Sequence, residues 1–246
     1  MNINWNNTLP RWMAIAVAWI GLGLGMACEQ TKEGEMQQRP AGFRLEAGDI
    51  LFQQLDCGPM CDAINRVTEG YNDYDFAHMG LVVEDSGRLG ILEAYGDSVL
   101  ITPMNEYLFR ATDSLGNPRI MVARLKPDYR HLIEDAMKFG KSYIGEPYDR
   151  EYLWDNGSYY CSELMYLAFH RANGDQPLFQ LYPMTFKDPD TGEFFKPWVE
   201  HYEKLGIDIP EGEPGCNPGG ISRSEALEMI HSFSPTLKLL QPESIQ

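Results

Sequence analysis

The sequence predicts an α+β fold in which a small antiparallel sheet packs against helices. Two strand-like runs flank the segment Asp85-Ser86-Gly87-Arg88, whose polar residues and glycine are typical of a hairpin turn. Farther along the chain, apolar residues recur at helical spacing in residues 129–139 and again after Cys161. The length of 246 residues fits one domain of ordinary size with appendages.

The predicted elements follow one another from residue 47 onwards. A turn at Ala47-Gly48-Asp49 leads into the first strand, and the helix of residues 129–139 stops near Gly140. Prolines and turn residues indicate mainly loop between Arg171 and Gly220. The predicted strands are residues 50–53, 77–84, 90–94, 98–101 and 120–125, and the predicted helices are 62–68, 129–139, one that begins at Cys161, and 222–231.

The first 28 residues differ in kind from the rest. Arg11 precedes an apolar stretch, residues 12–26, that is short for a membrane span and is typical of a secretory signal. The segment from Leu24 to Cys28 resembles a bacterial lipobox, in which Cys28 is lipidated and becomes the mature N-terminus. An ordinary cleaved signal or an uncleaved anchor are the alternatives.

We therefore expect an exported lipoprotein of the bacterial cell envelope, anchored to the membrane on the periplasmic side. Residues 1–28 are the predicted signal peptide with its lipobox, and the polar residues 29–45 a flexible tether. Residues 46–246 are the predicted folded domain. The net charge of −16 and the pI near 4.6 argue against a broad phosphate-binding surface, so nucleic acid is not an expected partner.

Cys57 and Cys61 are the obvious local cysteine pair. Gly58-Pro59 between them forms a turn, across which the two sulfur atoms can meet at the start of the next helix. Two free thiols are the alternative. A metal site would need further cysteine or histidine ligands, and no second pair stands nearby, so no metal is expected. Whether Cys216 forms a pair is left open.

Cys161 is the residue on which the functional interpretation depends. It stands directly before the apolar run that begins at Leu164, and so at a helix N-terminus. Unpaired N–H groups and the positive end of the helix dipole favour thiolate there and would stabilise a nearby oxyanion. A buried structural cysteine is the alternative.

His78 is the candidate base. It lies on a predicted strand that must be largely buried, where a histidine needs a hydrogen-bonding partner. Glu93 on the neighbouring predicted strand is a suitable partner, because a buried carboxylate also needs one. A purely structural histidine is the alternative. The remaining histidines lie in helical or helix-like segments, where we expect solvated surface: His131, His170, His201 and His231.

Five short motifs occur in order along the chain: Gly48 to Gln53, Phe76 to Gly80, Leu92 to Ala94, Gly145 to Asp149, and Tyr160 to Glu163. With them, residues 46–235 resemble the YiiX/YaeF group of circularly permuted papain-like cysteine hydrolases, which are related to the NlpC-type peptidases. The resemblance implies a permuted papain-like fold with the nucleophile at a helix N-terminus. The Cys57–Cys61 insertion departs from the enterobacterial pattern. We expect it to reshape the rim of the pocket, so the family's substrate preference is not carried over to this chain.

Carried over by position, the resemblance implies that Cys161 is the nucleophile, His78 the general base and later acid, and Glu93 the group that orients His78. Tyr160 matches a tyrosine that lines the substrate pocket, and no cofactor is implied. Glu163 is a rival third member, although an acid in the first helical turn has a simpler favourable role there.

The sequence thus predicts a cysteine hydrolase that cleaves an amide bond of an amino acid or peptide through a thioester. One alternative is a lipid acyl hydrolase or acyltransferase on the same fold, and a second is a non-catalytic envelope module that binds a ligand. The expected partner is a small amide, peptide or lipid substrate. Four aromatic residues could line an acyl groove or belong to the core: Phe186, Phe194, Phe195 and Trp198.

Overall fold

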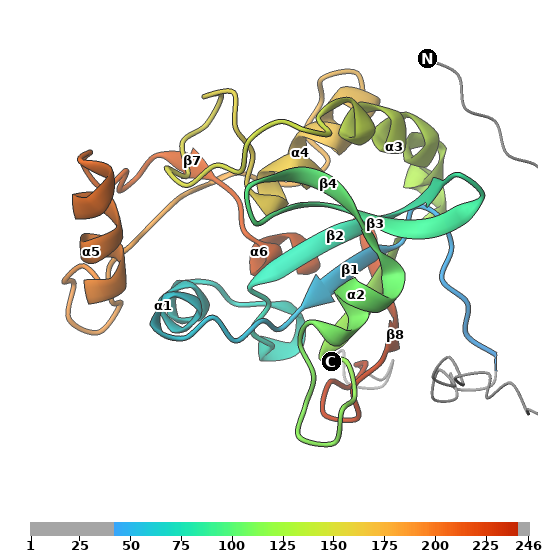
Figure 1. The fold of residues 1–246 in the computed structure, drawn as a ribbon, viewed down its shortest axis with the longest axis horizontal. Coiled ribbons are helices and arrows are strands. Elements are labelled where there is room, and N and C mark those ends of the chain that lie inside the picture. The colour runs from blue at the N-terminus through green and yellow to red at the C-terminus, as the bar shows by residue number, and fades with distance from the viewer. Residues whose placement is uncertain (1–41, 241–246) are drawn as a thin grey trace, which may run out of the picture. The chain divides into compact units, whose positions relative to one another are not determined.

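A six-stranded antiparallel sheet forms the centre of the computed structural model, which describes residues 42–240. The strand order is β4-β3-β2-β1-β5-β8 (Figure 1). Together with the helices around it, this sheet confirms the predicted α+β class. The strands are β1 (Ile50–Gln53), β2 (His78–Asp85), β3 (Arg88–Tyr95), β4 (Ser98–Pro103), β5 (Ile120–Leu125) and β8 (Leu227–Ser232).

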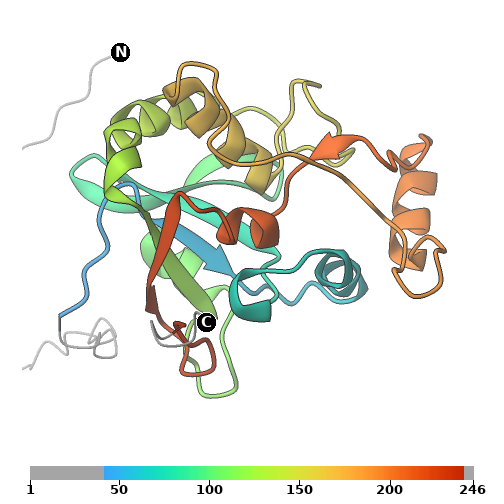
Figure 2. The same cartoon turned by 180° about the vertical axis from the view of Figure 1, so that it is seen from behind.

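The helices are distributed unevenly around this sheet. Helices α3 and α4 pack on each other and cover one face, whereas α1 and α5 lie together beside the sheet (Figures 1 and 2). A two-stranded pairing of β6 (Tyr182–Pro183) with β7 (Pro214–Gly215) completes the fold. The helices are α1 (Pro59–Val67), α2 (Met104–Phe109), α3 (Ile133–Ser142), α4 (Cys161–Ala172), α5 (Lys196–Leu205) and α6 (Pro218–Ser222), with 3₁₀ turns at Tyr71–Asp73 and Pro127–Leu132.

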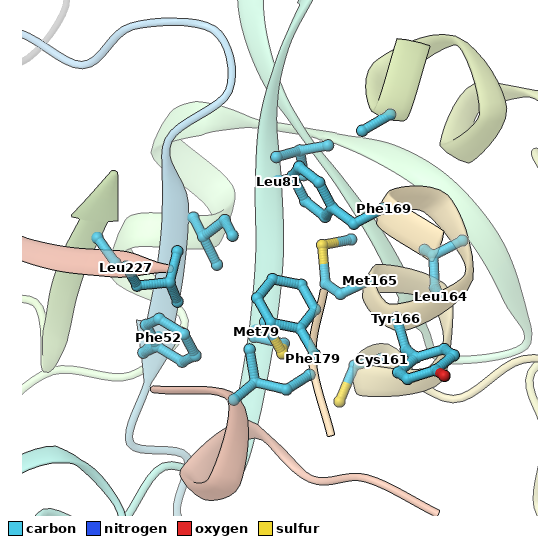
Figure 3. Packing of buried hydrophobic residues seen from close by; sticks show 14 of the residues in the cluster. Phe52, Met79, Leu81, Cys161, Leu164, Met165, Tyr166, Phe169, Phe179 and Leu227 are labelled. Carbon is cyan, nitrogen blue, oxygen red and sulfur yellow. The ribbon is translucent and has the colours of Figure 1, made fainter. Parts of the chain in front are cut away.

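Alternate residues of the strands build a core on each face of the sheet. On the larger side, Phe52 of β1 and Met79 of β2 meet Met165 and Phe169 of α4 (Figure 3). On the other side, Tyr107 of α2 covers a smaller apolar cluster against which Phe43 and Leu45 also pack. The compact unit begins at Gly42, a few residues before the predicted start of the domain.

Helix α3 ends near Gly140, as predicted, but it includes this glycine and continues to Ser142. The missing Cβ is the reason. A Cβ at Gly140 would lie 2.6 Å from Cδ2 of Leu92, so the glycine lets α3 pack directly against β3 and α4. Packing therefore outweighs the low helix propensity of glycine. The predicted start of this helix is also shifted, because residues from Pro127 to Leu132 form a 3₁₀ turn.

The predicted helix 222–231 is wrong. The segment contains the end of α6 and then β8, whose residues from Leu227 to Ser232 pair with β5. The edge of β5 offers backbone donors and acceptors, and pairing there places Leu227 and Met229 against one core and Ile230 against the other. Tertiary pairing outweighs the local preference of a short segment.

Helix α5 lies within the region predicted as loop. Pro197 is the misleading signal, because proline is favourable in the first turn of a helix, where its missing N–H is unpaired in any case. The helix buries Trp198 and Tyr202 against α1 and Phe186. Trp198 and Tyr202 have the spacing of one helix face, but the prolines around them favoured a loop prediction.

Cys57 and Cys61 form a disulfide at the start of α1. The predicted helix 62–68 starts at Pro59, so the crosslink closes its first turn. The predicted signal peptide, lipobox and Cys28, and nearly all of the tether, lie outside the described residues. Among residues 42–240, no helix has the length and apolar character to span a membrane.

Phe169 tests the packing of α4 on the sheet. Replacing this fully buried side chain with alanine leaves a cavity, so we expect Phe169→Ala to lower the free energy of unfolding by about 3–5 kcal/mol. Phe109→Ala is the matched control, because Phe109 is half exposed, and it should change stability by about 0.5 kcal/mol or less. Urea unfolding of both variants measures the difference, and equal effects would contradict the assigned core.

Candidate active site

Cys161 is the first residue of α4, as the sequence predicts (Figure 3). Tyr160 before it has an extended backbone and no side-chain cap, so the first N–H groups of the helix have neither intrahelical partners nor a capping side chain. The thiol is not in a disulfide and is 6% exposed. It belongs to the packed core and at the same time lines a cavity.

His78 and Glu93 lie at the same end of the sheet, on the adjacent strands β2 and β3. Nε2 of His78 is 2.5 Å from Oε2 of Glu93, and both side chains are buried. Cys161 lies near enough to His78 to raise the pKa of the imidazole. Because Nε2 is engaged by Glu93, Nδ1 is the ring nitrogen that remains for the thiol. The structure thus brings the three predicted residues together.

Arg110 is a site residue that the sequence analysis missed. Its guanidinium forms two hydrogen bonds with Glu93, of 2.8 and 2.6 Å, and stacks 3.6 Å above the ring of Tyr95. Thr102 of β4 donates a further hydrogen bond to Glu93. The sequence carried only an indirect signal for this arginine. A carboxylate buried inside a strand needs a positively charged partner, and a neutral imidazole is not one, so another part of the chain had to provide a cation.

These contacts set the charges of the site. Burial alone would raise the pKa of Glu93. The hydrogen bonds from Arg110, His78 and Thr102 have the larger, opposite effect and lower this pKa to about 2. Burial likewise lowers the pKa of His78, but Cys161 and Glu93 raise it more strongly, to about 9. At neutral pH the buried cluster therefore holds Glu93 as carboxylate and His78 as imidazolium, which places a positive charge beside Cys161.

Gly80 makes room for the aromatic ring that backs His78. A Cβ at Gly80 would lie 2.4 Å from Cγ2 of Ile91 and 3.2 Å from Cε2 of Tyr107, so the glycine avoids a clash with Ile91 and leaves room for the ring of Tyr107. The ring centroids of Tyr107 and His78 are 5.9 Å apart, and the Tyr107 hydroxyl donates to the carbonyl of Leu51. The imidazole is therefore held by packing as well as by Glu93.

Tyr160 is buried beside the cavity, and its hydroxyl accepts a hydrogen bond from the N–H of Cys216 at 3.3 Å. The hydroxyl of Ser162 donates a hydrogen bond to the carbonyl oxygen of Cys216 at 3.0 Å. These two bonds tie the chain around Cys216 to the start of α4. Cys216 is a free, buried thiol that lines the cavity with Cys161, and burial raises its pKa strongly.

Glu163 is not the partner of His78. It is completely buried, and neither carboxyl oxygen has a hydrogen-bond partner. Burial and the charge of Asp149 raise its pKa to about 8, against the opposing effect of nearby backbone N–H groups. The carboxyl is therefore mostly protonated at neutral pH. Glu163 does lie in the first turn of α4, where the sequence places it.

The connection before α4 shapes the wall of the cavity. Asp149 is buried and accepts hydrogen bonds from the N–H groups of Glu151 and Leu153, at 2.8 and 2.9 Å. Between these two residues, Tyr152 has a φ of 55°, an unusual value for a bulky residue. Its ring packs against Tyr160 and Trp198. Asp149 thus fixes a strained turn that places an aromatic side chain beside the thiol.

A cavity of about 360 Å³ opens beside Cys161. Aromatic and aliphatic side chains dominate its lining, as is common for ligand sites. Of the four aromatic residues considered for an acyl groove, two line the cavity, Phe195 packs behind it, and Phe194 is exposed. The principal lining residues are Ile64, Val67, Tyr148, Tyr152, Tyr160, Met184, Phe186, Trp198 and Cys216.

The remaining polar candidates have structural roles or face solvent. Asp49 receives two hydrogen bonds from Arg124, of 2.7 and 3.0 Å, and holds the turn before β1. His131 is exposed, as predicted. His231 lies on β8 rather than on a helix and stacks on Phe43 with ring centroids 3.9 Å apart, so it is not a solvated surface residue.

The titration of His78 is a direct test of this charge arrangement. Wild-type His78 should titrate near pH 9, and its pKa should fall in Cys161→Ala because the charge interaction with Cys161, the largest effect that raises this pKa, is lost. A raised folded-state pKa stabilises the protein fully below pH 6.5 and loses that stabilisation as the pH rises through about 9. NMR of the imidazole protons measures both midpoints, and an unchanged midpoint in Cys161→Ala would contradict the contact.

Arg110→Met tests the neutralisation of Glu93. Loss of one partner leaves a buried charge, so unfolding free energy should fall by about 3–5 kcal/mol. Adding Glu93→Gln removes that charge and should restore part of the stability, although not the site. Arg150→Met, which breaks an exposed pair with Asp97, is the control with little effect. Additive losses in Arg110→Met/Glu93→Gln would argue against the coupling.

Comparison with known proteins identifies the family and the fold of the chain. Residues 44–231 match the family described as permuted papain-like amidase enzymes, YaeF/YiiX, C92 family. The chain is 26% identical over 132 residues to the uncharacterized protein YiiX of Escherichia coli (strain K12), a match that covers 54% of this chain and 61% of that relative. The match thus spans about three fifths of the relative's length.

A solved structure shows the same fold. The crystal structure of the metalloprotein YiiX from Escherichia coli O157:H7 superposes with a TM-score of 0.59 at 22% identity, over 77% of this chain and 98% of that one. The predicted resemblance and the predicted fold are confirmed. The chain therefore belongs to the YaeF/YiiX family of permuted papain-like amidases, a family of cysteine hydrolases.

Proposed function

We propose that the protein hydrolyses an amide bond of an amino acid or short peptide, with Cys161 as nucleophile, His78 as acid and base, and Glu93 as the residue that orients His78. The observation that carries this proposal is the buried chain from Arg110 through Glu93 to His78, which ends at a thiol on a helix N-terminus. Membership of an amidase family supports the same reaction class.

The mechanism starts from an ion pair. The thiolate of Cys161 attacks the carbonyl carbon, and the oxyanion that forms is held by the unpaired N–H groups at the start of α4. The imidazolium of His78 then gives its proton to the departing amine, which leaves a thioester. The neutral imidazole next takes a proton from water, whose oxygen attacks the thioester and releases the acid. The hydrogen bond from Nε2 to Glu93 keeps Nδ1 directed at these protons.

We further propose export and lipid anchoring through Cys28, on the strength of the signal-like residues 12–26 and the lipobox-like residues 24–28. This would place the site in the cell envelope, facing peptide or lipid substrates. The measurement is the mass of the mature N-terminus after expression in a bacterium that processes lipoproteins. A diacylated Cys28 supports anchoring, and an unmodified N-terminus at Met1 contradicts it.

The solved relative is a metalloprotein, which raises the question of a metal in this chain. The donor set does not suit one. Nε2 of His78 and both oxygens of Glu93 are already engaged, which leaves the Cys161 sulfur and Nδ1 of His78. The described part of the chain has no group of three or more His, Cys, Asp or Glu residues placed to hold a metal ion.

A lipid acyl substrate is the second candidate, and the apolar cavity beside Cys161 is the observation that favours it. Under this alternative the thioester carries a fatty acyl group. Incubation of the protein with a lipid extract, followed by intact mass measurement, distinguishes the two. An adduct of fatty-acyl mass on Cys161 supports the lipid substrate, whereas its absence together with hydrolysis of peptide amides supports the amidase.

The experiment that tests the proposed function compares labelling with turnover. Iodoacetamide should label Cys161 rapidly at pH 7, and His78→Ala should slow labelling by about 100-fold, because the imidazolium that favours thiolate is lost. Hydrolysis of aminoacyl 4-nitroanilides should fall by a similar factor or more. His131→Ala is the matched control, since His131 is exposed and remote from this network. Equal labelling rates of Cys161 in wild type and His78→Ala would contradict the mechanism.

The pH dependence gives an independent check. Turnover should fall above about pH 9, where His78 loses the proton that the leaving amine needs. Iodoacetamide labelling should not fall there, since it requires only the thiolate. Parallel loss of both rates above pH 9 would contradict the assigned role of the imidazolium.

A further inference from the structure

The cavity beside Cys161 lies where two apolar clusters meet. The thiol and Tyr160 belong to the main core, whereas the opposite wall belongs to a separate cluster built by α1, α5 and the segment around Phe186. Figures 1 and 2 show α1 and α5 side by side and away from the sheet. The chemistry and the opposite wall of the pocket therefore rest on different packing units.

One face of α1 provides part of that wall. Met60, Ala63, Ile64 and Val67 recur at the spacing of a single helix face. Three of them join the α1–α5 cluster, and both Ile64 and Val67 line the cavity. The position of α1 thus determines how much space an apolar substrate group finds beside the thiol.

Helix α1 packs against α5 through Ala63 and Ile64, but its first turn has little stability of its own. It has nine residues, fewer than an isolated helix needs in water, and the residue before it, Gly58, has no side chain to cap the first turn. The disulfide between Cys57 and Cys61 spans this uncapped turn. Cys57 is exposed, whereas Cys61 is buried against the protein, so the crosslink joins the loop from β1 to the packed part of the helix.

We propose that the Cys57–Cys61 disulfide is a specificity element of the hydrolase site: it fixes α1 as a wall that selects substrates with a bulky apolar group next to the scissile carbonyl. The crosslink takes no part in the chemistry. This inference rests on the proposed function in one respect: it takes the sulfur of Cys161 as the reacting atom. Its consequence is a preference for large apolar groups that depends on residues remote from His78 and Glu93.

The test uses two electrophiles that react with Cys161 by the same displacement of iodide. Iodoacetamide is too small to need the wall, and N-octyl iodoacetamide places an alkyl chain in the cavity. On the full-length protein, the rate of each at the Cys161 peptide is followed by mass spectrometry. We expect wild type to prefer the octyl reagent by about tenfold or more, as burial of several methylene groups implies. In Cys57→Ser/Cys61→Ser the preference should shrink to about twofold, with the iodoacetamide rate unchanged.

A second variant guards against a folding defect in the first. Val67→Phe keeps the disulfide and fills part of the cavity, so the ratio of the octyl rate to the iodoacetamide rate should fall to that of a reagent without a binding wall. Asp62→Asn, an exposed residue on the same helix, is the matched control and should keep the preference. The proposal is overturned if the double serine variant retains the octyl preference, or if wild type has none.

The outcomes also separate this proposal from the proposed function. If iodoacetamide reacts slowly in every protein, or without dependence on His78, the hydrolase mechanism fails whatever the octyl ratio is. If iodoacetamide reacts rapidly and in a manner dependent on His78, while the octyl ratio does not respond to the disulfide, only the specificity proposal fails.

Discussion

The bidentate contact between Arg110 and Glu93 is the interaction on which the site depends. Burying a carboxylate inside a sheet is energetically unfavourable unless a cation neutralises it. An imidazole can neutralise it only when the imidazole is protonated. With Arg110 in place, Glu93 stays ionised and can hold Nε2 of His78 at 2.5 Å. The cluster then contains two positive and two negative charges when Cys161 is a thiolate. A balanced ion pair can therefore persist in a dry environment.

The fold supplies this network from three directions. The β2–β3 hairpin brings His78 and Glu93 together, the segment after α2 delivers Arg110, and the sheet face packs α4 so that its N-terminus reaches the imidazole. Gly80 is part of the same arrangement, because its missing Cβ lets Tyr107 support the ring. Rigid elements carry the reacting groups, which keeps their geometry precise.

The pocket is organised differently from the chemistry. Its reacting wall belongs to the main core, and its opposite wall belongs to the α1–α5 cluster with its disulfide. Tyr152 packs with both clusters and is held in a strained turn by Asp149. Such a division lets substrate preference vary through α1 and α5 while the contacts of the thiol and imidazole stay the same.

The sequence by itself determined the sheet strands up to residue 125, the position of Cys161 at a helix start, and the pairing of His78 with Glu93, because alternation, turn residues and helical spacing are local signals. The tertiary structure alone decided what distant residues supply. It brought Arg110 to Glu93, recruited β8 to the edge of β5, carried α3 past Gly140, and buried Glu163 without a partner. Each of these outcomes depends on the burial or pairing of groups far apart in the chain, and no local pattern encodes that.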